Sequence, residues 1–208
     1  QVSQNIYKEL QDKGIFESYE VEIGRLAREN DKVAPQNILN DAQKKAFEEI
    51  KDSFRQKNVT LLHGVTSAGK TEIYIHLITE ALERGEQVLF MLPEIALTKQ
   101  ITERLRRVFG NKIGVYHSKF SDAERVEIWK KQLSEEPYEI ILGVRSSLFL
   151  PFKKLGLIVV DEEHENSYKQ QDPAPRYNAR NAAIVLASLY GAKTLLGTAT
   201  PSIDSYYN

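Results

Sequence analysis

The sequence predicts an α/β domain with a mostly parallel sheet and helices on both of its faces. Short apolar runs alternate along the chain with amphipathic stretches, and most of the runs are apolar at nearly every position. Strands of that kind indicate a sheet that is buried on both faces, and strand–helix alternation favours parallel strands. Because ligands bind beyond the carboxyl ends of the strands in such sheets, we expect the functional residues directly after the apolar runs.

The predicted elements follow in order from residue 39. The first is a helix that begins at Asn40 or Asp41, either of which can cap its N-terminus, and that carries one apolar face. Six strands are then predicted at Val59–His63, Val88–Leu92, Ile113–Tyr116, Ile140–Val144, Leu157–Val160 and Thr194–Gly197. Helices are predicted between most of them at Thr71–Arg84, Ile95–Phe109, Asp122–Leu133 and Asn178–Tyr190.

The composition limits the class of protein. The chain has 208 residues, of which 41% are hydrophobic and 27% are charged, as is usual for a globular domain with a full core. Its formal net charge of -1 gives no electrostatic argument for nucleic acid or a membrane as partner. The absence of cysteine excludes disulfides and thiolate zinc sites within this chain and suits a reducing cytoplasm. No apolar run approaches the roughly 20 residues that a membrane span needs.

Residues 1–30 have a pattern of their own. A short helix that ends near Gly14 is followed by an alternating stretch, Ile15–Ile23, which is typical of a strand or hairpin arm. This segment is too short to bury its own core, so we expect it to be the end of a neighbouring domain. It also lacks an initiator Met, which suggests a piece of a longer protein. Residues 31–38 are a predicted linker, because Pro35 disfavours helix just before it.

The stretch after the first predicted strand matches the phosphate-binding pattern G-x-x-x-x-G-K-[ST] at every fixed position. Gly64 and Gly69 allow the backbone to turn consecutive N–H groups toward an anion, and the following helix adds its positive N-terminal dipole. Lys70 is expected to reach the β and γ phosphates, and the hydroxyl of Thr71 to coordinate Mg²⁺. The other loop residues assigned to nucleotide binding are Thr66, Ser67 and Ala68. An ordinary glycine-rich turn is the alternative.

An acidic cluster follows the fifth predicted strand. The apolar run Leu157–Val160 leads directly into Asp161, Glu162, Glu163 and His164. A magnesium site beside a phosphate loop requires an acid at the carboxyl end of a buried strand, so Asp161 is the predicted cation ligand. Glu162 is well placed to orient and polarise an attacking water. A solvated acidic turn is the alternative.

The ordered motifs together identify a family. They are Leu39-Asn40-x-x-Gln43, Gly64–Thr71 followed by Glu72, Leu92-Pro93-Glu94-Ile95, His117-Ser118, Arg145-Ser146, Leu157–His164, Ser167–Gln170, Arg176-Tyr177 and Ala199–Ser202. Over residues 37–208 the chain resembles superfamily 2 helicases, and more narrowly the bacterial primosomal replication-restart helicases. The resemblance implies that residues 39–208 form a RecA-like P-loop NTPase lobe, the first of two lobes in a 3′–5′ DNA helicase motor. It also implies that residues 1–30 are the tail of a winged-helix domain.

The resemblance implies further roles at the nucleotide site. Gln43 is expected to read the adenine ring, with a helix-surface glutamine as the alternative, and Glu72 is counted with the nucleotide-binding residues. His164, Thr198 and Thr200 are expected to couple hydrolysis to DNA engagement across the cleft. The expected catalytic residues are then Lys70, Asp161, Glu162 and His164.

A DNA-binding surface is also implied. The expected contacts are Arg145, Ser146, Tyr168, Lys169, Arg176 and Tyr177. The two tyrosines would lie in an aromatic-rich loop that senses single-stranded DNA, where a ring stacked on a base contributes about 1–3 kcal/mol. The basic side chains would contact phosphates. A tyrosine-bearing surface loop held by packing is the alternative for this loop, and a salt bridge between helix and sheet is the alternative for Arg145.

The same resemblance implies cofactors and partners. ATP and Mg²⁺ are expected here, whereas zinc is expected only in the missing part of the parent protein. Forked and single-stranded DNA, primosome proteins and single-strand-binding proteins are the implied partners, at the bacterial nucleoid. The chain itself is expected to be a monomer that hydrolyses ATP poorly, because the arginine finger, which can be worth roughly 10³–10⁵ in rate, belongs to the second lobe.

Two other functions compete with the helicase lobe. A P-loop kinase or other small-molecule phosphotransferase would need an arginine-bearing lid and a phosphoacceptor site, and neither is evident. The other competing function is that of a non-catalytic interaction module with a relict nucleotide site. The intact residues Lys70, Thr71, Asp161 and Glu162 argue against such decay.

Overall fold

The computed structural model describes residues 34–65, 68–93, 99–117 and 120–207. The segment predicted as the tail of a neighbouring domain, residues 1–30, lies outside these ranges, as do residues 31–33 of the predicted linker. Within them, no helix is both long and apolar enough to cross a membrane.

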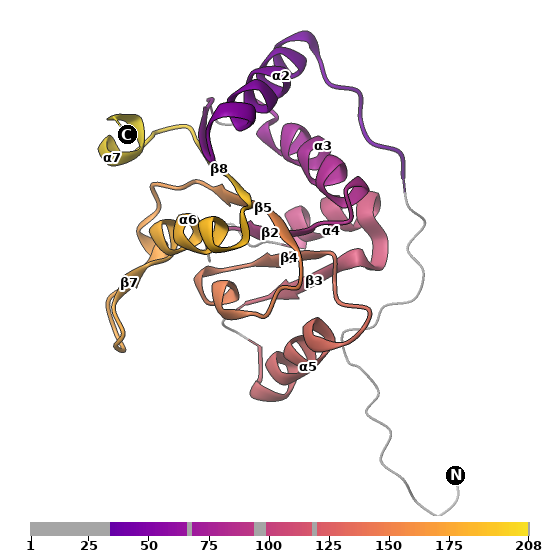
Figure 1. The fold of residues 1–208 in the computed structure, drawn as a ribbon, viewed down its shortest axis with the longest axis vertical. Helices are drawn as coiled ribbons and strands as arrows, with labels where there is room; N and C mark the ends of the chain where they lie inside the picture. The colour runs from indigo at the N-terminus through magenta and orange to yellow at the C-terminus, as the bar shows by residue number, and fades with distance from the viewer. Residues whose placement is uncertain (1–33, 66–67, 94–98, 118–119, 208) are drawn as a thin grey trace, which may run out of the picture.

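A six-stranded parallel sheet forms the centre of the domain, in the order β1-β8-β5-β2-β4-β3 (Figure 1). The strands are β1 (Val59–His63), β2 (Gln87–Met91), β3 (Ile113–Tyr116), β4 (Ile140–Gly143), β5 (Leu155–Asp161) and β8 (Lys193–Thr198). β1 and β3 begin and end at the predicted residues, and the other four lie on the predicted runs with slightly shifted ends. The predicted parallel sheet is therefore confirmed.

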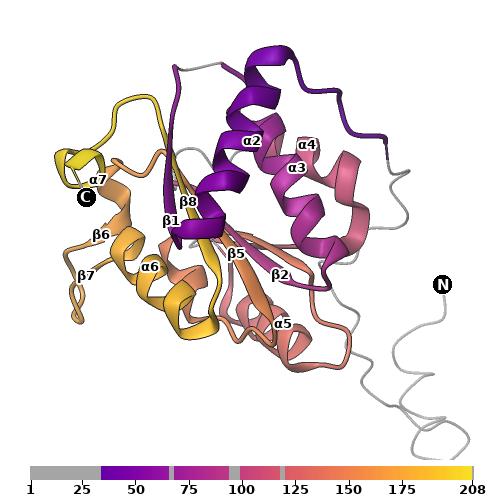
Figure 2. The ribbon, with the colours of Figure 1, turned by 45° about the horizontal axis from the view of Figure 1, so that its top comes forward.

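Helices cover both faces of the sheet (Figure 2). The helices are α2 (Asp41–Gln56), α3 (Lys70–Glu83) and α4 (Lys99–Phe109) on one face, with α5 (Asp122–Leu133) and α6 (Ala179–Tyr190) on the other. The side chains of β2 show why: Val88 and Phe90 belong to the core under the first group, whereas Leu89 and Met91 belong to the core under the second. All four are fully buried, so this strand is apolar on both sides.

Local signals set the ends of the helices. Asn40 accepts a hydrogen bond from the Gln43 amide and the Gln43 side chain accepts one from the Asn40 amide, a reciprocal cap that begins α2. Asn178 caps α6, and Gly191 ends it with a φ of 67°. Ile95, the predicted start of the helix before β3, lies outside the described residues. The described part of this helix, α4, begins at Lys99.

Several short elements were not predicted. They are α7 (Ile203–Tyr207), the 3₁₀ turns η1 (Gly110–Lys112), η2 (Arg145–Phe149) and η3 (Asn166–Tyr168), and a hairpin of β6 (Lys169–Gln170) and β7 (Tyr177–Asn178). Strands of two residues are too short to show any periodicity. Figure 1 shows the hairpin extending away from the main sheet beside α6.

The order of the strands brings the ends of β1, β8 and β5 together. The chain crosses from β1 to β2 over the positions that β8 and β5 occupy. At the carboxyl edge His63 of β1 lies opposite Thr198 of β8, and Gly197 lies opposite Asp161 of β5. The loop after β1 and the acidic turn after β5 are consequently neighbours.

Candidate active site

The loop after β1 leads directly into the first turn of α3. The N–H of Gly64 donates to the carbonyl oxygen of Thr198 at 3.0 Å, which continues the contact between β1 and β8 into the loop. Gly69 precedes the helix with a φ of 77°, in the left-handed region that favours glycine. A Cβ atom at Gly69 would also collide with Nε2 of Gln43. Both observations explain why glycine occupies this position.

Lys70 lies between the loop and the acidic turn. Its Nζ donates to the carbonyl oxygen of Gly64 at 3.0 Å and lies 3.6 Å from Oε1 of Glu162. The Lys70 side chain is only 9% exposed, so its charge is held inside the site rather than in solvent. Glu162 has a φ of 47°, the sole positive φ of a non-glycine residue in the described ranges. Strained backbone of this kind gathers at functional sites.

Two tyrosines hold Asp161. The hydroxyl of Tyr74, on α3, donates to Oδ1 of Asp161 at 2.8 Å, and the hydroxyl of Tyr168 donates to the Asp161 carbonyl oxygen at 2.7 Å. Burial raises the pKa of the Asp161 carboxyl above its ordinary value, although the bond from Tyr74 acts against the increase. Burial, followed by the charge of Asp161, raises the pKa of Tyr74 far above its ordinary value, so this phenol remains a donor.

His164 contacts both threonines that were expected to act with it. Its Nδ1 lies 2.8 Å from Oγ1 of Thr198, and its Nε2 lies 3.2 Å from Oγ1 of Thr200. Oε2 of Glu162 is 3.7 Å from Nδ1 of the same ring. The imidazole therefore joins the acidic turn to the segment that follows β8.

Glu163 points away from the site and into the protein. Its carboxylate accepts hydrogen bonds from Nη1 of Arg180 at 2.7 Å, from the Ser202 amide at 2.8 Å and from the Ser205 hydroxyl at 2.8 Å. Burial by itself would raise the pKa of Glu163, but these three donors outweigh it and hold the pKa below its ordinary value. The network fixes the acidic turn to α6 and to the C-terminal segment.

Gln43 reaches the phosphate loop from α2. Its Nε2 donates to the carbonyl oxygen of Gly69 at 3.3 Å, while its Oε1 accepts from the Asn40 amide. The half-buried side chain thus connects the cap of α2 with the start of α3.

The remaining loop residues differ in their surroundings. Glu72 is buried and pairs with Arg104 of α4, so its carboxylate is directed to that helix. Thr71 is half-buried in the first turn of α3, and Ala68 is exposed. Thr66 and Ser67 were assigned to nucleotide binding and lie outside the described residues.

The structure requires one correction to the expected DNA surface. The ring of Tyr168 is 1% exposed and packs in the core between the sheet and α6, so no base can stack on it. The expectation that Tyr168 contacts DNA is therefore wrong in this structure, because its ring is needed for packing and its hydroxyl for the bond to Asp161.

The other expected DNA contacts lie in and around η2 and the small hairpin. Lys169 and Arg176 are exposed, and Tyr177 is half-buried with its ring edge-to-face against the exposed ring of Phe149. Ser146 is half-buried. Nη1 of Arg145 donates to the Ser167 carbonyl oxygen at 3.2 Å, a bond that ties this guanidinium to the backbone of η3.

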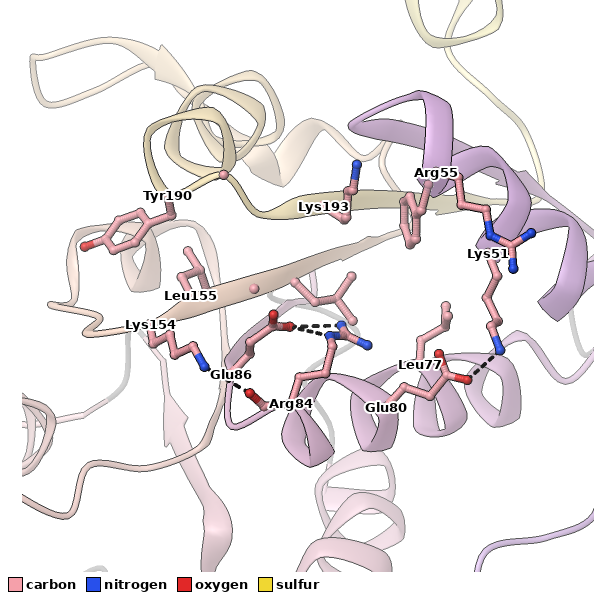
Figure 3. Close-up of a pocket in the computed structure, with 14 residues that line it drawn as sticks. Lys51, Arg55, Leu77, Glu80, Arg84, Glu86, Lys154, Leu155, Tyr190 and Lys193 are labelled. Carbon is pink, nitrogen blue, oxygen red and sulfur yellow. Dashed lines mark hydrogen bonds and ion pairs between the residues drawn. The ribbon is translucent and has the colours of Figure 1, made fainter.

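A separate cavity of about 420 Å³ opens at the opposite, amino-terminal edge of the sheet (Figure 3). Its charged side chains largely engage one another: Lys51 pairs with Glu80 at 2.8 Å, and Arg84 pairs with Glu86 at 2.9 Å. Lys154 donates to the carbonyl oxygen of Arg84 at 2.9 Å. None of the predicted site residues lines this cavity.

Residues 40–208 match the family model of the DEAD/DEAH box helicases, which covers most of the chain. The chain belongs to the DEAD/DEAH box helicase family. The predicted resemblance to helicases is thereby confirmed.

Within this helicase family the chain is similar to replication restart protein PriA from several bacteria. It is 44% identical over 170 residues to PriA of Helicobacter pylori, covering 82% of this chain and 26% of that protein. It is 42% identical over 170 residues to PriA of Bacillus subtilis, covering 81% and 21%. For PriA of Haemophilus influenzae the identity is 41% over 215 residues, covering 99% and 29%. The chain thus spans between a fifth and a third of the length of these relatives.

Solved structures support the fold. RecG bound to a three-way DNA junction superposes with a TM-score of 0.58 and 22% identity, over 99% of this chain and 24% of that one. The SWI2/SNF2 ATPase core of Sulfolobus solfataricus in complex with double-stranded DNA gives a TM-score of 0.54 and 17% identity, over 87% and 36%. At these identities the likeness shows the fold, and together with the family model it confirms the predicted RecA-like lobe.

A DEAD/DEAH box helicase domain binds ATP together with a divalent cation, and the residues at the carboxyl edge fit that pair. Lys70 is a buried cation beside a glycine-bounded loop at a helix N-terminus, which suits phosphate oxygens. Asp161 offers a carboxylate held in place by Tyr74. In the described ranges no group of three or more His, Cys, Asp or Glu could hold a metal alone.

Sequence reasoning missed the residues that hold the site in shape. Tyr74 looked like one more apolar position of an amphipathic helix, and nothing local distinguishes a buried tyrosine that bonds to a carboxylate. Ser202 belonged to a recognised motif without a role, and Ser205 had no signal. Arg180 also had no assigned part in the site, yet its side chain is 9% exposed and bonded to Glu163.

Proposed function

We propose that this chain is the ATP-binding motor lobe of a 3′–5′ DNA helicase that restarts stalled replication forks and couples ATP hydrolysis to unwinding and primosome loading. The observation that carries the proposal is the approach of Lys70 to Glu162 beside Asp161, at the edge where β1, β8 and β5 end. The PriA relatives supply the restart role, since they are named replication restart proteins.

Each site residue takes a distinct part in this proposal. Lys70 and the loop amides bind the β and γ phosphates of ATP, exchanging the Gly64 carbonyl for phosphate oxygens. Thr71 and Asp161 hold Mg²⁺, which neutralises negative charge on the phosphates when bound. Glu162 orients the attacking water and accepts its proton. Gln43, whose Nε2 bonds to the Gly69 carbonyl oxygen, reads the adenine ring.

DNA is the proposed partner of the surface around the small hairpin. Lys169 and Arg176 are exposed cations there, and the rings of Phe149 and Tyr177 lie beside them on neighbouring elements. Exposed cations and aromatic rings are the components of single-strand binding. Figure 2 shows the hairpin and α6 on the same side of the sheet as α5. RecG and the SWI2/SNF2 core carry DNA in their solved structures.

The proposal extends to parts of the protein beyond the described lobe. Residues 39–208 are assigned to the ATP-binding lobe, residues 31–38 to a linker and residues 1–30 to the tail of a winged-helix domain. Zinc, primosome proteins and single-strand-binding proteins are assigned to the parent protein in the bacterial cytoplasm. A small-molecule kinase is not favoured, because the helicase family model covers residues 40–208.

The proposal is tested in the two-lobe parent protein. ATP hydrolysis is measured with and without forked or single-stranded DNA for wild type, Lys70→Ala and Lys154→Ala, the last removing a lysine at the opposite edge of the sheet. We expect DNA to stimulate wild type and Lys154→Ala, and Lys70→Ala to lose activity. Hydrolysis that is indifferent to DNA, with phosphate transfer to a small molecule, would instead support a kinase.

A further inference from the structure

Tyr74 occupies an unusual position beside the proposed cation site. It lies one helical turn after Lys70 on α3, and its ring is fully buried. The ring packs edge-to-face against Phe90 of β2, with 5.5 Å between centroids and 77° between planes. Its hydroxyl, the one polar atom of the side chain, is directed at Oδ1 of Asp161 at 2.8 Å. Packing thus determines where the hydroxyl lies.

The hydrogen bond between Tyr74 and Asp161 lies directly against a glycine, Gly197. A Cβ atom on Gly197 of β8 would collide with the hydroxyl oxygen of Tyr74 and would lie 3.2 Å from Oδ1 of Asp161. Gly197 is paired with Asp161 in the sheet, so β8 has no side chain at the point where the Tyr74 hydroxyl reaches the Asp161 carboxylate. The chain therefore makes room for this hydrogen bond at a position where any other side chain would exclude it.

The backbone and the side chain of Asp161 are each held by a hydrogen bond from a tyrosine. Tyr168 bonds to its main-chain oxygen, whereas Tyr74 bonds to a carboxylate oxygen. Of these two bonds, only the second acts on the carboxylate, whose rotation decides where its lone pairs point; the Glu162 amide also bonds to this carboxylate. Because Lys70 and Tyr74 are on adjacent turns of the same helix, α3 sets the positions of the phosphate-binding amine and of the carboxylate together.

We propose that Tyr74 is a positioning residue that orients the Asp161 carboxylate toward the cation of the bound nucleotide. The inference rests on the proposed function, because it requires the nucleotide and cation to bind at this edge. Because Tyr74 is fully buried and its hydroxyl is bonded to Asp161, it would act on the cation through that carboxylate. Its loss therefore affects the part of nucleotide binding that depends on the divalent cation.

The test is nucleotide binding by the full-length protein with Mg²⁺ and with EDTA. Tyr74→Phe removes a single oxygen and keeps the packed ring. Tyr190→Phe is the matched control, because the Tyr190 hydroxyl also donates one hydrogen bond, to the Phe152 carbonyl oxygen at 3.0 Å, at the opposite edge of the sheet. We expect Tyr74→Phe to weaken ATP binding roughly tenfold in Mg²⁺, the effect of losing one bond to a charged group, and not in EDTA. Tyr190→Phe should change neither.

A second background separates positioning from simple support of the fold. In Asp161→Asn protein there is no carboxylate charge to direct at the cation, so adding Tyr74→Phe should cause no further loss in Mg²⁺. Equal losses in Mg²⁺ and EDTA, no loss in either, or the same loss in both backgrounds would overturn the proposal. If Lys70→Ala binds ATP as tightly as wild type, the proposed function itself fails, and the role of Tyr74 fails with it.

Discussion

Nη1 of Arg180 lies 2.7 Å from Oε2 of Glu163, and both side chains are almost completely buried. The pair joins the first turn of α6 to the turn after β5, directly beside the candidate catalytic carboxylates. The amide of Ser202 and the hydroxyl of Ser205 complete the shell of donors around Glu163. The acidic turn is therefore anchored to α6 by a buried charge pair on the side away from the candidate nucleotide site.

Replacing Arg180 with Met should destabilise the chain strongly. The substitution keeps much of the apolar stem but leaves the Glu163 carboxylate buried without its cation. Breaking a buried pair from one side costs about 3–5 kcal/mol, which we expect as the fall in the free energy of unfolding measured with urea. Arg55→Met is the matched control, because Arg55 pairs with Asp52 on the exposed surface of α2, where pairs contribute about 0–1 kcal/mol. Equal effects would contradict the prediction.

Acid should weaken the fold partly through Glu163. Its pKa is held below the ordinary value in the folded state, so its contribution to stability is present above the ordinary pKa of about 4.3 and is lost as the pH falls through the folded pKa. Glu163→Gln should therefore unfold with less pH dependence than wild type in this acid range. The raised pKa of Asp161 acts with the opposite sign but is common to both proteins. Parallel acid profiles would exclude a contribution from Glu163.

Gly69→Ala should harm both stability and nucleotide binding. The substitution forces alanine into a φ of 77° and brings its Cβ against Gln43. Gly191→Ala isolates the first effect, because Gly191 has a φ of 67° and an added Cβ there would have no atom within 4 Å, so it should cost roughly 1–2 kcal/mol. Thermal unfolding should show the larger loss for Gly69→Ala. Adding Gln43→Ala should recover part of the difference, and no recovery would argue against the collision.

His164→Ala should uncouple hydrolysis from DNA in the two-lobe parent. The ring connects Glu162 with Thr198 and Thr200, so its removal breaks the bonds to the segment after β8 and leaves Lys70 and its loop in place. We expect DNA-stimulated turnover to fall at least about tenfold, from the loss of such bonds, with nucleotide affinity nearly unchanged. His76→Ala is the control, since His76 bonds to the Asn37 carbonyl oxygen on α3's outer side. If His76→Ala lowered DNA-stimulated turnover as much as His164→Ala, the coupling role of His164 would be excluded.

The elements of the fold were predictable because each depends on local pattern. β1 and β3 were located to the residue from continuous apolar runs, and α5 from its apolar spacing. The phosphate loop could be located because its glycines, lysine and threonine have fixed spacing. The small hairpin and α7 were missed, since each is too short for periodicity to reveal it. The residues of the phosphate loop and the acidic turn were named, whereas Tyr74 and Ser205, which hold the acidic turn in place, were not.

Tyr168 shows where the family resemblance did not carry over to this chain. The resemblance implied an aromatic-rich DNA-binding loop that includes this tyrosine, yet its ring is in the core and its hydroxyl bonds to Asp161. Burial of such a residue depends on how η3 returns across the sheet toward α6. That path is set by packing between segments distant in sequence, and the local composition carries no information about it.

The sequence by itself determined the strands, the helices, the phosphate loop and the acidic turn, because backbone geometry, capping and alternating burial act over a few neighbouring residues. Only the tertiary structure decided that β8 lies between β1 and β5, that Lys70 approaches Glu162, and that Tyr74 and Arg180 bond to Asp161 and Glu163. Those contacts arise when whole elements pack against one another, and the free energy that selects among packings belongs to the assembled core rather than to any single segment.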